Sequence, residues 1–188
     1  MRRFLSSIFI FLFSIPLWSA NSHQTTFHAD GLSLRKNKKV GVGMTAMGAY
    51  GVTGLHLELN FTPKISAVTG FGLGDGYQTF NFQIRNMIGG TSFIPYVAAG
   101  YARWYTTSND PKDFSETTPE FLGKDFLNSE ERRGRFAENI IYPAAGVQFI
   151  MLDGEWAGFA INAEFQFLID IDDLVSAPAG SLGVSYYF

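Results

Sequence analysis

Apolar and polar residues alternate with a period of two along most of this chain. The last nine residues show the pattern most simply, with Leu182, Val184, Tyr186 and Phe188 on one face and Ser181, Gly183, Ser185 and Tyr187 on the other. Successive side chains of a β-strand point to opposite faces. The segment 180–188 is therefore predicted to be a strand with a bulky apolar face and a small polar face.

Seven further segments read as strands, with the clearest alternation at 55–61 and 159–169. The eight predicted strands are 40–47, 55–61, 65–73, 79–88, 93–105, 139–151, 159–169 and 180–188. Tight turns at 62–64, 89–92 and 153–155 join some of them, whereas the links at the opposite end include a long loop of about residues 106–138. Short turns at one end and longer loops at the other are typical of outer-membrane barrels. We expect an all-β fold, an eight-stranded antiparallel up-and-down transmembrane β-barrel.

The volume of the side chains decides which face of the barrel points inward. The interior of an eight-stranded barrel is just wide enough to be filled by side chains. The many Phe, Leu and Ile residues would overfill it, whereas Gly, Ser, Thr and Asn fit, so the apolar face is predicted to meet lipid. The alternative is a secreted, lipocalin-like barrel with its apolar face inside. In the membrane orientation, aromatic girdles are expected at one end from Phe61, Phe93, Trp156, Tyr186 and Phe188 and at the other from Tyr50, Tyr77, Trp104, Tyr105 and Tyr142.

The first residues predict export. Two arginines follow Met1, an apolar stretch runs to Trp18, and small residues follow it, as in a signal peptide. We expect a signal peptide over 1–22 rather than an uncleaved anchor, because the apolar run is shorter than the roughly 20 residues of a spanning helix. Cleavage after Ser22 is favoured over Ala20, because it places the small Ala20 rather than the bulky Trp18 at the −3 position. Residues 23–38 are then a periplasmic N-terminal leader with a basic end, and 39–188 are the barrel. With 0 Cys there is no disulfide framework, and a net charge of −3 argues against a nucleic-acid partner.

Four charged residues fall within the predicted strands, and all four are assigned to the polar, lumenal face. They are Glu58, Arg85, Arg103 and Glu164, and His56 lies beside Glu58 on the same face. Two acids and two bases in a narrow lumen must pair, because an isolated buried charge is costly. They predict either a structural network in a plugged polar lumen or the gate of a narrow channel for ions or small solutes.

His56 and Glu58 could also be a base and its orienting carboxylate in a barrel enzyme. A resemblance to those small outer-membrane barrels that act on lipid A would then imply a lipid A-modifying activity. This is the less favoured alternative, because His56 is the one histidine within the predicted barrel and no nearby serine stands out as a nucleophile. We therefore expect no catalytic residues and no cofactor. With a single barrel histidine and no cysteine, no metal site is expected either.

The long loop 106–138 is the most distinctive candidate for function. It carries eight of the 17 acids of the chain together with the basic residues Arg132, Arg133 and Arg135. Mixed charge predicts a solvated excursion, and loops on a rigid scaffold often bind partners. Lipopolysaccharide or an unknown extracellular ligand could meet the three arginines, or the loop could be a passive solvated cover.

The C-terminal Tyr186-Tyr187-Phe188 resembles the closing strand of bacterial outer-membrane barrels, and Pro95-Tyr96-Val97-Ala98-Ala99-Gly100-Tyr101 is similar to a strand common in the group around the OmpA transmembrane domain, OmpX and the opacity proteins. The resemblance implies a protein of the Gram-negative outer membrane, surrounded by lipid and lipopolysaccharide, with Phe188 recognised by the assembly machinery. We expect a monomer with an envelope-structural or surface-interaction role. The chain departs from the group in lacking the peptidoglycan-binding domain of OmpA-type proteins and in having one long loop, so no residue's role is carried over.

Overall fold

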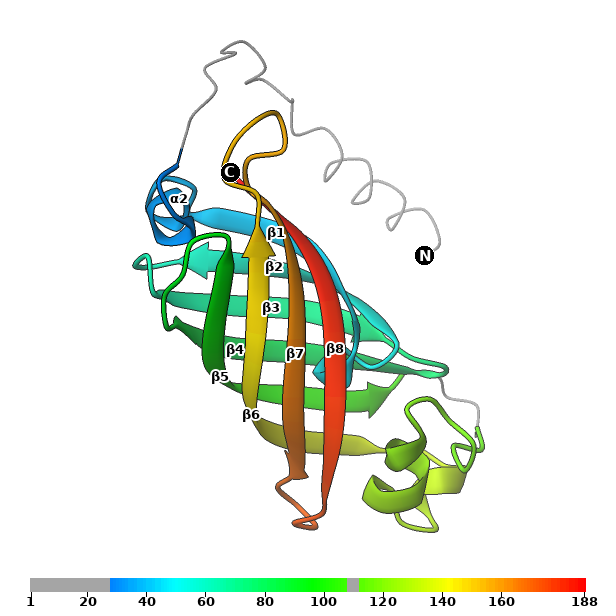
Figure 1. Cartoon of the computed structure of the whole chain (residues 1–188). Coiled ribbons are helices and arrows are strands. Elements are labelled where there is room, and N and C mark those ends of the chain that lie inside the picture. The colour runs from blue at the N-terminus through cyan, green and yellow to red at the C-terminus, as the bar shows by residue number, and fades with distance from the viewer. Residues whose placement is uncertain (1–27, 108–111) are drawn as a thin grey trace, which may run out of the picture.

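Eight strands form a closed antiparallel barrel in which each strand pairs with its neighbours in sequence and the last pairs with the first (Figure 1). The computed structural model describes residues 28–107 and 112–188, so the expected signal peptide 1–22 lies outside the described residues. The strands are β1 (Val40–Met47), β2 (Thr53–Asn60), β3 (Ile65–Leu73), β4 (Tyr77–Met87), β5 (Phe93–Thr106), β6 (Ala137–Ile150), β7 (Phe159–Asp170) and β8 (Ser176–Tyr187). The predicted eight-stranded up-and-down barrel is confirmed. Within the described ranges, no helix is long and apolar enough to cross a membrane.

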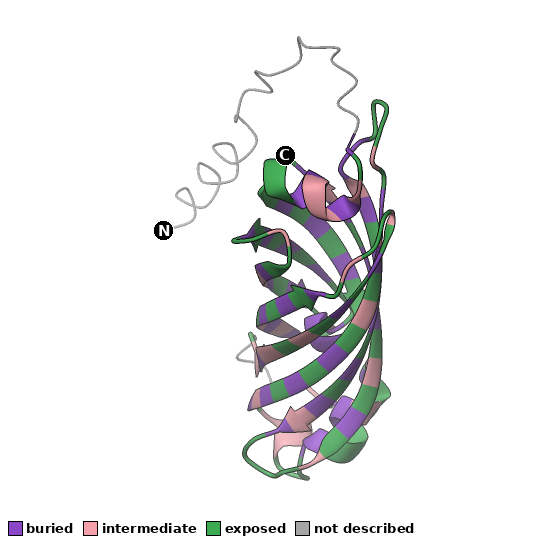
Figure 2. Cartoon of the chain, turned by 60° about the vertical axis from the view of Figure 1, so that its left-hand side comes forward, coloured by how far each residue is buried: buried purple, intermediate pink, exposed green. Residues whose placement is uncertain are grey.

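The barrel wall is apolar outside and polar inside. In β2 the side chains of Leu55, Leu57 and Leu59 are exposed, whereas His56 and Glu58 are buried in the interior. The same alternation runs along the neighbouring strands, as the green and purple stripes of Figure 2 show. Antiparallel pairing holds this register, because a slip by one residue would send every side chain to the opposite face. The lipocalin-like arrangement, with the apolar face inside, is therefore wrong.

Strand β5 faces the other way from our prediction. Arg103 is exposed on the outer wall, whereas Tyr96, Ala102 and Trp104 point inward and are buried. The indole of Trp104 has a partner inside, because its Nε1 donates to the backbone oxygen of Ala49 at 3.0 Å. Arg103 lies close to the end of this 14-residue strand. There a long side chain can reach water from an apolar wall.

The two ends of the barrel differ in how their strands are linked. We call the end that holds residues 61–64, 88–92 and 151–158 the turn end. The loop end holds 48–52, 74–76, 171–175 and the described part of the long loop, residues 107 and 112–136. At the turn end lies a short helix, α2 (Gly31–Asn37), within the segment expected to be a leader. It begins with a capping box in which Ser33 N donates to Asp30 Oδ1 at 2.6 Å and Asp30 N donates to Ser33 Oγ at 3.2 Å.

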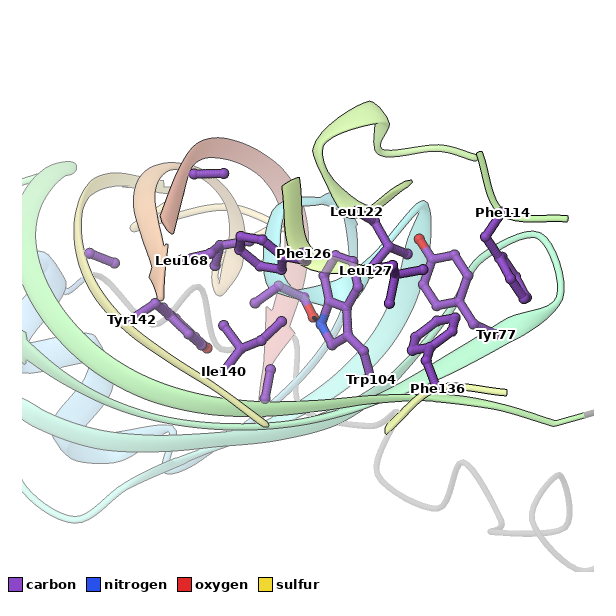
Figure 3. Close-up of a cluster of buried hydrophobic side chains, with 14 residues drawn as sticks. Tyr77, Trp104, Phe114, Leu122, Phe126, Leu127, Phe136, Ile140, Tyr142 and Leu168 are labelled. Carbon is purple, nitrogen blue, oxygen red and sulfur yellow. Dashed lines mark hydrogen bonds between the residues drawn. The ribbon is translucent and has the colours of Figure 1, made fainter. Parts of the chain in front are cut away.

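An apolar cluster lies inside each end of the barrel. The turn-end cluster consists of Leu34, Met87, Ile94, Tyr96, Ile150, Ala160 and Tyr187. The loop-end cluster is built around Tyr77, Trp104, Phe114, Leu122, Phe126, Leu127, Phe136, Ile140, Tyr142 and Leu168 (Figure 3). The long loop, which contains η2 (Leu122–Phe126) and η3 (Glu131–Arg133), thus buries its apolar residues in the barrel mouth. It is not the fully solvated excursion that its charge predicted.

The two clusters explain which of the predicted girdle residues lie inside the barrel rather than on its outer wall. At the turn end, Phe61, Phe93, Trp156 and Phe188 are exposed on the outer wall, as predicted for a girdle. At the loop end the predicted girdle is wrong for four of its five members, because the rings of Tyr50, Tyr77, Trp104 and Tyr142 are buried inside. Tyr77 and Trp104 stack there with ring centroids 5.4 Å apart. Alternation alone could not reveal this, since an aromatic ring fits a lipid boundary and an apolar core equally well.

Candidate functional site

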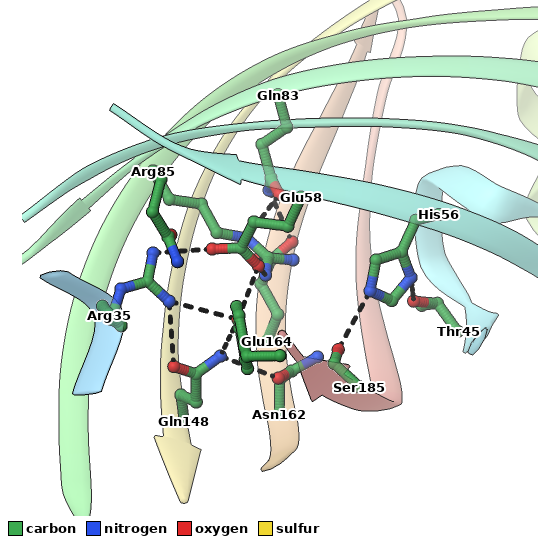
Figure 4. Close-up of polar contacts among 12 residues, drawn as sticks. Arg35, Thr45, His56, Glu58, Gln83, Arg85, Gln148, Asn162, Glu164 and Ser185 are labelled. Atoms are coloured by element: carbon green, nitrogen blue, oxygen red, sulfur yellow. Dashed lines mark hydrogen bonds and ion pairs between the residues drawn. The ribbon is translucent and has the colours of Figure 1, made fainter. Parts of the chain in front are cut away.

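A buried carboxylate, that of Glu58, is the centre of the polar lumen. Its Oε1 accepts from Arg35 Nη2 at 2.7 Å, and its Oε2 accepts from Tyr187 OH at 2.8 Å and from Arg85 Nη1 at 3.2 Å. Glu58 is fully buried and points inward from β2, so both oxygens depend on these partners. Figure 4 shows the two guanidinium groups converging on it from α2 and β4.

Arg35 reaches the lumen from α2 rather than from the barrel wall. Its Nη1 donates to Gln148 Oε1 and to Tyr187 OH, both at 3.1 Å, and its Nε donates to the backbone oxygen of Pro63 at 3.3 Å. Burial lowers the pKa of this guanidinium, but the adjacent Glu58 carboxylate and Tyr187 hydroxyl together raise it by more, so its net pKa lies above the usual value. Arg35 is therefore a permanent cation within the barrel.

Sequence analysis placed Arg35 in a basic leader and missed its role. The signal that could have found it is local: Asp30 and Ser33 form a capping box, and Leu34 and Arg35 follow directly. That spacing predicts a helix start, and the buried Leu34 beside Arg35 indicates a helix that docks against the barrel.

Arg85 links Glu58 to the second buried acid, Glu164. Its Nε donates to Gln83 Oε1 at 2.7 Å, and its Nη2 lies 3.6 Å from Glu164 Oε2. Gln83 Nε2 donates to Glu164 Oε1 at 2.9 Å, and Gln166 Nε2 donates to the same oxygen at 2.5 Å. Glutamines thus fix the carboxylate that Arg85 faces. We call these residues the lumen network: Arg35, Glu58, Gln83, Arg85, Gln148, Glu164 and Tyr187.

The network has two acids and two bases, but one base differs from the prediction. Glu58, Arg85 and Glu164 face the lumen as expected, whereas Arg103 lies outside and Arg35 takes its place. Two guanidinium groups and two carboxylates leave no net charge, which matters because an uncompensated buried charge costs several kcal/mol, on the order of 3–5. The fourth charged residue was misidentified, because Arg103 was assigned to the lumen and Arg35 was not.

His56 lies near the network but has its own partners. Its Nε2 is 3.0 Å from Ser185 Oγ and its Nδ1 is 3.0 Å from Thr45 Oγ1, so the ring bridges β8, β2 and β1. Ser185 is a serine beside histidine that sequence reasoning missed, because 129 residues separate the pair. In a nucleophilic triad a carboxylate orients the histidine. Here a neutral hydroxyl occupies that place, and Glu58 is bonded to Arg35, Arg85 and Tyr187 instead.

Polar contacts continue from the network towards the loop end. The backbone N–H of Ala49, in the inward turn η1 (Gly48–Tyr50), donates to Gln166 Oε1 at 2.7 Å, and Tyr142 OH donates to Asn81 Oδ1 at 2.6 Å. Tyr77 OH donates to the backbone oxygen of Thr118 at 2.7 Å. These hydrogen bonds attach η1 and the long loop to the inner wall of the barrel, on the loop-end side of the lumen network.

The three loop arginines have different surroundings. Arg132 donates from Nε to the Leu127 oxygen at 2.9 Å and from Nη2 to the Lys124 oxygen at 2.8 Å, so it holds the loop's own backbone. Arg133 and Arg135 are exposed. Within the described residues, the acids grouped closely enough to hold a metal ion are Glu138, Asp170 and Asp172, at the loop end and outside the lumen network.

Comparison with known proteins relates this fold to small outer-membrane barrels. A scan against protein-family models gave no match, and a search of the curated proteins gave no significant match. Among solved structures, the N-terminal β-barrel domain of Pseudomonas aeruginosa OprF is similar, with 16% identity, a TM-score of 0.56 and coverage of 80% of this chain and 98% of that one. The attachment invasion locus protein Ail of Yersinia pestis also aligns, with 13% identity, a TM-score of 0.40 and coverage of 80% and 97%. The chain therefore shares the fold of the OprF barrel, as the resemblance in sequence predicted.

Proposed function

We propose that this chain is an integral protein of the Gram-negative outer membrane, a non-enzymatic, monomeric barrel with a closed polar lumen. The observation that carries the proposal is the inside-out distribution of its side chains. Leu55, Phe71, Phe165 and Leu182 are each at least 60% exposed on the outer wall, whereas Glu58 and Arg85 are buried inside. Contiguous apolar patches beyond a few hundred Å² are rare on monomeric soluble proteins. A band of such residues around a whole barrel fits lipid.

The contacts of the lumen network support a closed rather than a conducting interior. Arg35 is held by Glu58, Gln148 and Tyr187 across the lumen, from β2, β6 and β8. An ion could pass through the lumen network only if these hydrogen bonds of Arg35 were broken. Breaking a buried ion pair by removal of one partner costs about 3–5 kcal/mol, so a resting open state would be rarely populated.

Two measurements on the folded full chain test these statements separately. In the first, we expect folding only with detergent or lipid, with β-type circular dichroism and a gel mobility that changes on heating. A chain that is soluble and folded without either would contradict the membrane proposal. In the second, planar-bilayer recording, we expect no stable unitary conductance. A steady conductance that is abolished by Arg85→Gln would establish the channel alternative and refute the closed lumen.

The proposal of no enzymatic role rests on the burial of His56 and Ser185, each 3% exposed inside the barrel. A lipid substrate approaching from the membrane would have to cross the barrel wall to reach them. Lipid A from cells that express the wild type, His56→Ala or no barrel should give identical mass spectra. A mass change that depends on His56 would establish the enzyme alternative.

The surface role is proposed for the exposed side of the loop 107–136. Its apolar residues are held in the barrel mouth, so Arg133 and Arg135 are presented on a fixed support rather than on a free tether. We expect the folded chain to bind vesicles containing lipopolysaccharide, and the double variant Arg133→Gln/Arg135→Gln to bind more weakly at low salt. The matched control removes two exposed cations, Lys36 and Lys39, at the turn end. Equal loss in both double variants would mean that the loop has no specific role.

A further inference from the structure

Three carboxylates meet at the loop end, where β6 begins and β7 ends. Glu138 is the second residue of β6, Asp170 is the last residue of β7, and Asp172 lies in the turn 171–175. The antiparallel pairing of Ile140 with Asp170 brings the two strands together here. One oxygen from each carboxylate lies within 4.8 Å of one from each of the others.

Two of these carboxylates are buried without a partner for one of their oxygens. Glu138 is 4% exposed and Asp170 is 0% exposed, and within the described structure no donor group of another residue reaches Glu138 Oε1 or Asp170 Oδ2, although the two carboxyl groups lie within hydrogen-bond reach of each other. No ion pair among the described residues involves either group. A buried carboxylate oxygen without a donor or a cation beside it is costly, because burial removes its hydration.

One oxygen of Asp170 and one oxygen of Asp172 are held in place, the first by a backbone N–H and the second by a side chain. Asp170 Oδ1 accepts from the backbone N–H of Asp172 at 2.9 Å, and Asp172 Oδ2 accepts from Asn139 Nδ2 at 3.1 Å. Asn139 is fixed in turn, because its Oδ1 accepts from Tyr101 OH at 2.8 Å. The carboxylates of Asp170 and Asp172 are therefore positioned before any ligand arrives, while two buried oxygens, Glu138 Oε1 and Asp170 Oδ2, remain available.

We propose that Glu138, Asp170 and Asp172 bind a divalent cation, with Ca²⁺ favoured over Mg²⁺. Ca²⁺ prefers oxygen ligands at about 2.3–2.6 Å, so two oxygens on one ion can be up to about 5.2 Å apart, and the separations within 4.8 Å in this cluster are compatible with that range. Mg²⁺ requires near-octahedral geometry at about 2.0–2.1 Å and gives up its water reluctantly. Because Asp172 is exposed, water can complete the coordination from the solvent side. The ion would tie the turn 171–175 to the start of β6.

The expectation of no metal site was based on nitrogen and sulfur ligands, which this chain lacks in suitable number. Carboxylate sites are harder to recognise in a sequence, because acids are common on protein surfaces. In this cluster, moreover, 31 residues lie between Glu138 and Asp170. Only the pairing of β6 with β7 brings them together.

Trp104 provides a direct test of the site. It lies opposite Glu138 in the β5–β6 ladder, and both side chains point inward. Directly opposed residues have Cβ atoms about 4.5–5.5 Å apart. Tb³⁺, an oxygen-seeking substitute for Ca²⁺, should therefore give tryptophan-sensitised emission when added to the folded full chain in detergent. We expect the emission to saturate at one ion per chain, and Ca²⁺ to displace Tb³⁺ at lower concentration than Mg²⁺.

Matched variants distinguish binding of the cation by this cluster from nonspecific attraction to nearby acidic residues. Asp170→Asn and Glu138→Gln should each weaken binding by about tenfold or more. Asp173→Asn, which removes the same charge from the exposed neighbour of Asp172, should change the affinity by less than about twofold. The heat-dependent gel mobility checks that each variant is folded. Absence of saturable emission from the folded wild type would overturn the proposal and indicate a shared proton between the two buried acids. Equal affinity of Asp170→Asn and wild type would also overturn it.

Discussion

Replacement of Arg35 by Gln should destabilise the barrel far more than its position before the first strand suggests. The change removes the cation that donates to Glu58 at 2.7 Å and leaves that carboxylate with Arg85 at 3.2 Å and Tyr187 at 2.8 Å. Loss of one partner from a buried ion pair costs about 3–5 kcal/mol. Because Glu58 keeps two donors, we place Arg35→Gln at the lower limit, about 3 kcal/mol.

Glu58→Gln should cost more, about 5 kcal/mol, because it leaves two buried guanidinium groups. Only Glu164, 3.6 Å from Arg85, would then offset their charge. The double variant should cost less than the sum of the two, with a coupling of about 1–3 kcal/mol, because either single change disrupts the same contact. Lys36→Gln is the matched control, since Lys36 is the exposed neighbour of Arg35 on the same helix. It should change stability by less than about 0.5 kcal/mol.

The assay is equilibrium urea unfolding of the chain refolded in detergent, followed by tryptophan fluorescence and by gel mobility. The reasoning predicts the order Glu58→Gln, Arg35→Gln, Lys36→Gln from least to most stable. If Arg35→Gln unfolds at the same urea concentration as Lys36→Gln, then α2 is not part of the closed barrel. If the two large effects add without coupling, the ion pair between Arg35 and Glu58 is not what stabilises the fold.

Three further outcomes are expected. In lipid vesicles, Leu57→Lys should cost about 2–4 kcal/mol and Leu57→Ile little, because Leu57 lies mid-strand on the outer wall; equal urea midpoints would contradict this placement. Gly72→Ala should cost about 1–3 kcal/mol, because an added Cβ would lie 2.0 Å from the backbone oxygen of Tyr50. Gly180→Ala should be tolerated in the same assay, because its added Cβ would lie 3.9 Å from the nearest atom. Phe188→Ala should reduce the amount of assembled barrel in cells without lowering the stability of refolded protein, because the Phe188 side chain is exposed. An unchanged amount of assembled barrel on heat-modifiable gels would show that Phe188 is not an assembly signal.

The strands were predictable where large apolar and polar residues alternate without interruption. In β2, and in β7 as far as Phe167, each outward Leu, Ile or Phe is separated from the next by a polar or small residue, so only one face can be the lipid face. Strand β5 lacked that contrast, because Ala98, Gly100 and Ala102 are small and give no volume argument. The assumption that Arg103 must be lumenal then reversed the assignment of the whole strand, since register has a period of two.

The lumen was predictable in its chemistry but not in its membership. Glu58, Arg85 and Glu164 could be recognised because each is a charge within a strand of clear alternation. Arg35 could not be found by that rule, because it enters the barrel end-on from α2. Ser185 and the acids Asp170 and Glu138 meet their partners only through strand pairing across the closed barrel. A single sequence carries no direct signal for such contacts.

The orientation of the wall can be measured directly, because the chain has 0 Cys and single cysteines can be introduced one at a time. Nitroxide labels at Leu55, Leu57 and Leu59, in protein reconstituted into lipid vesicles, report whether each position meets lipid or water. We expect ready access by oxygen and poor access by a water-soluble nickel chelate at all three, with the opposite result for a label at the exposed turn residue Glu155. A label at Leu57 that the nickel chelate reaches as easily as one at Glu155 would contradict a membrane-embedded barrel.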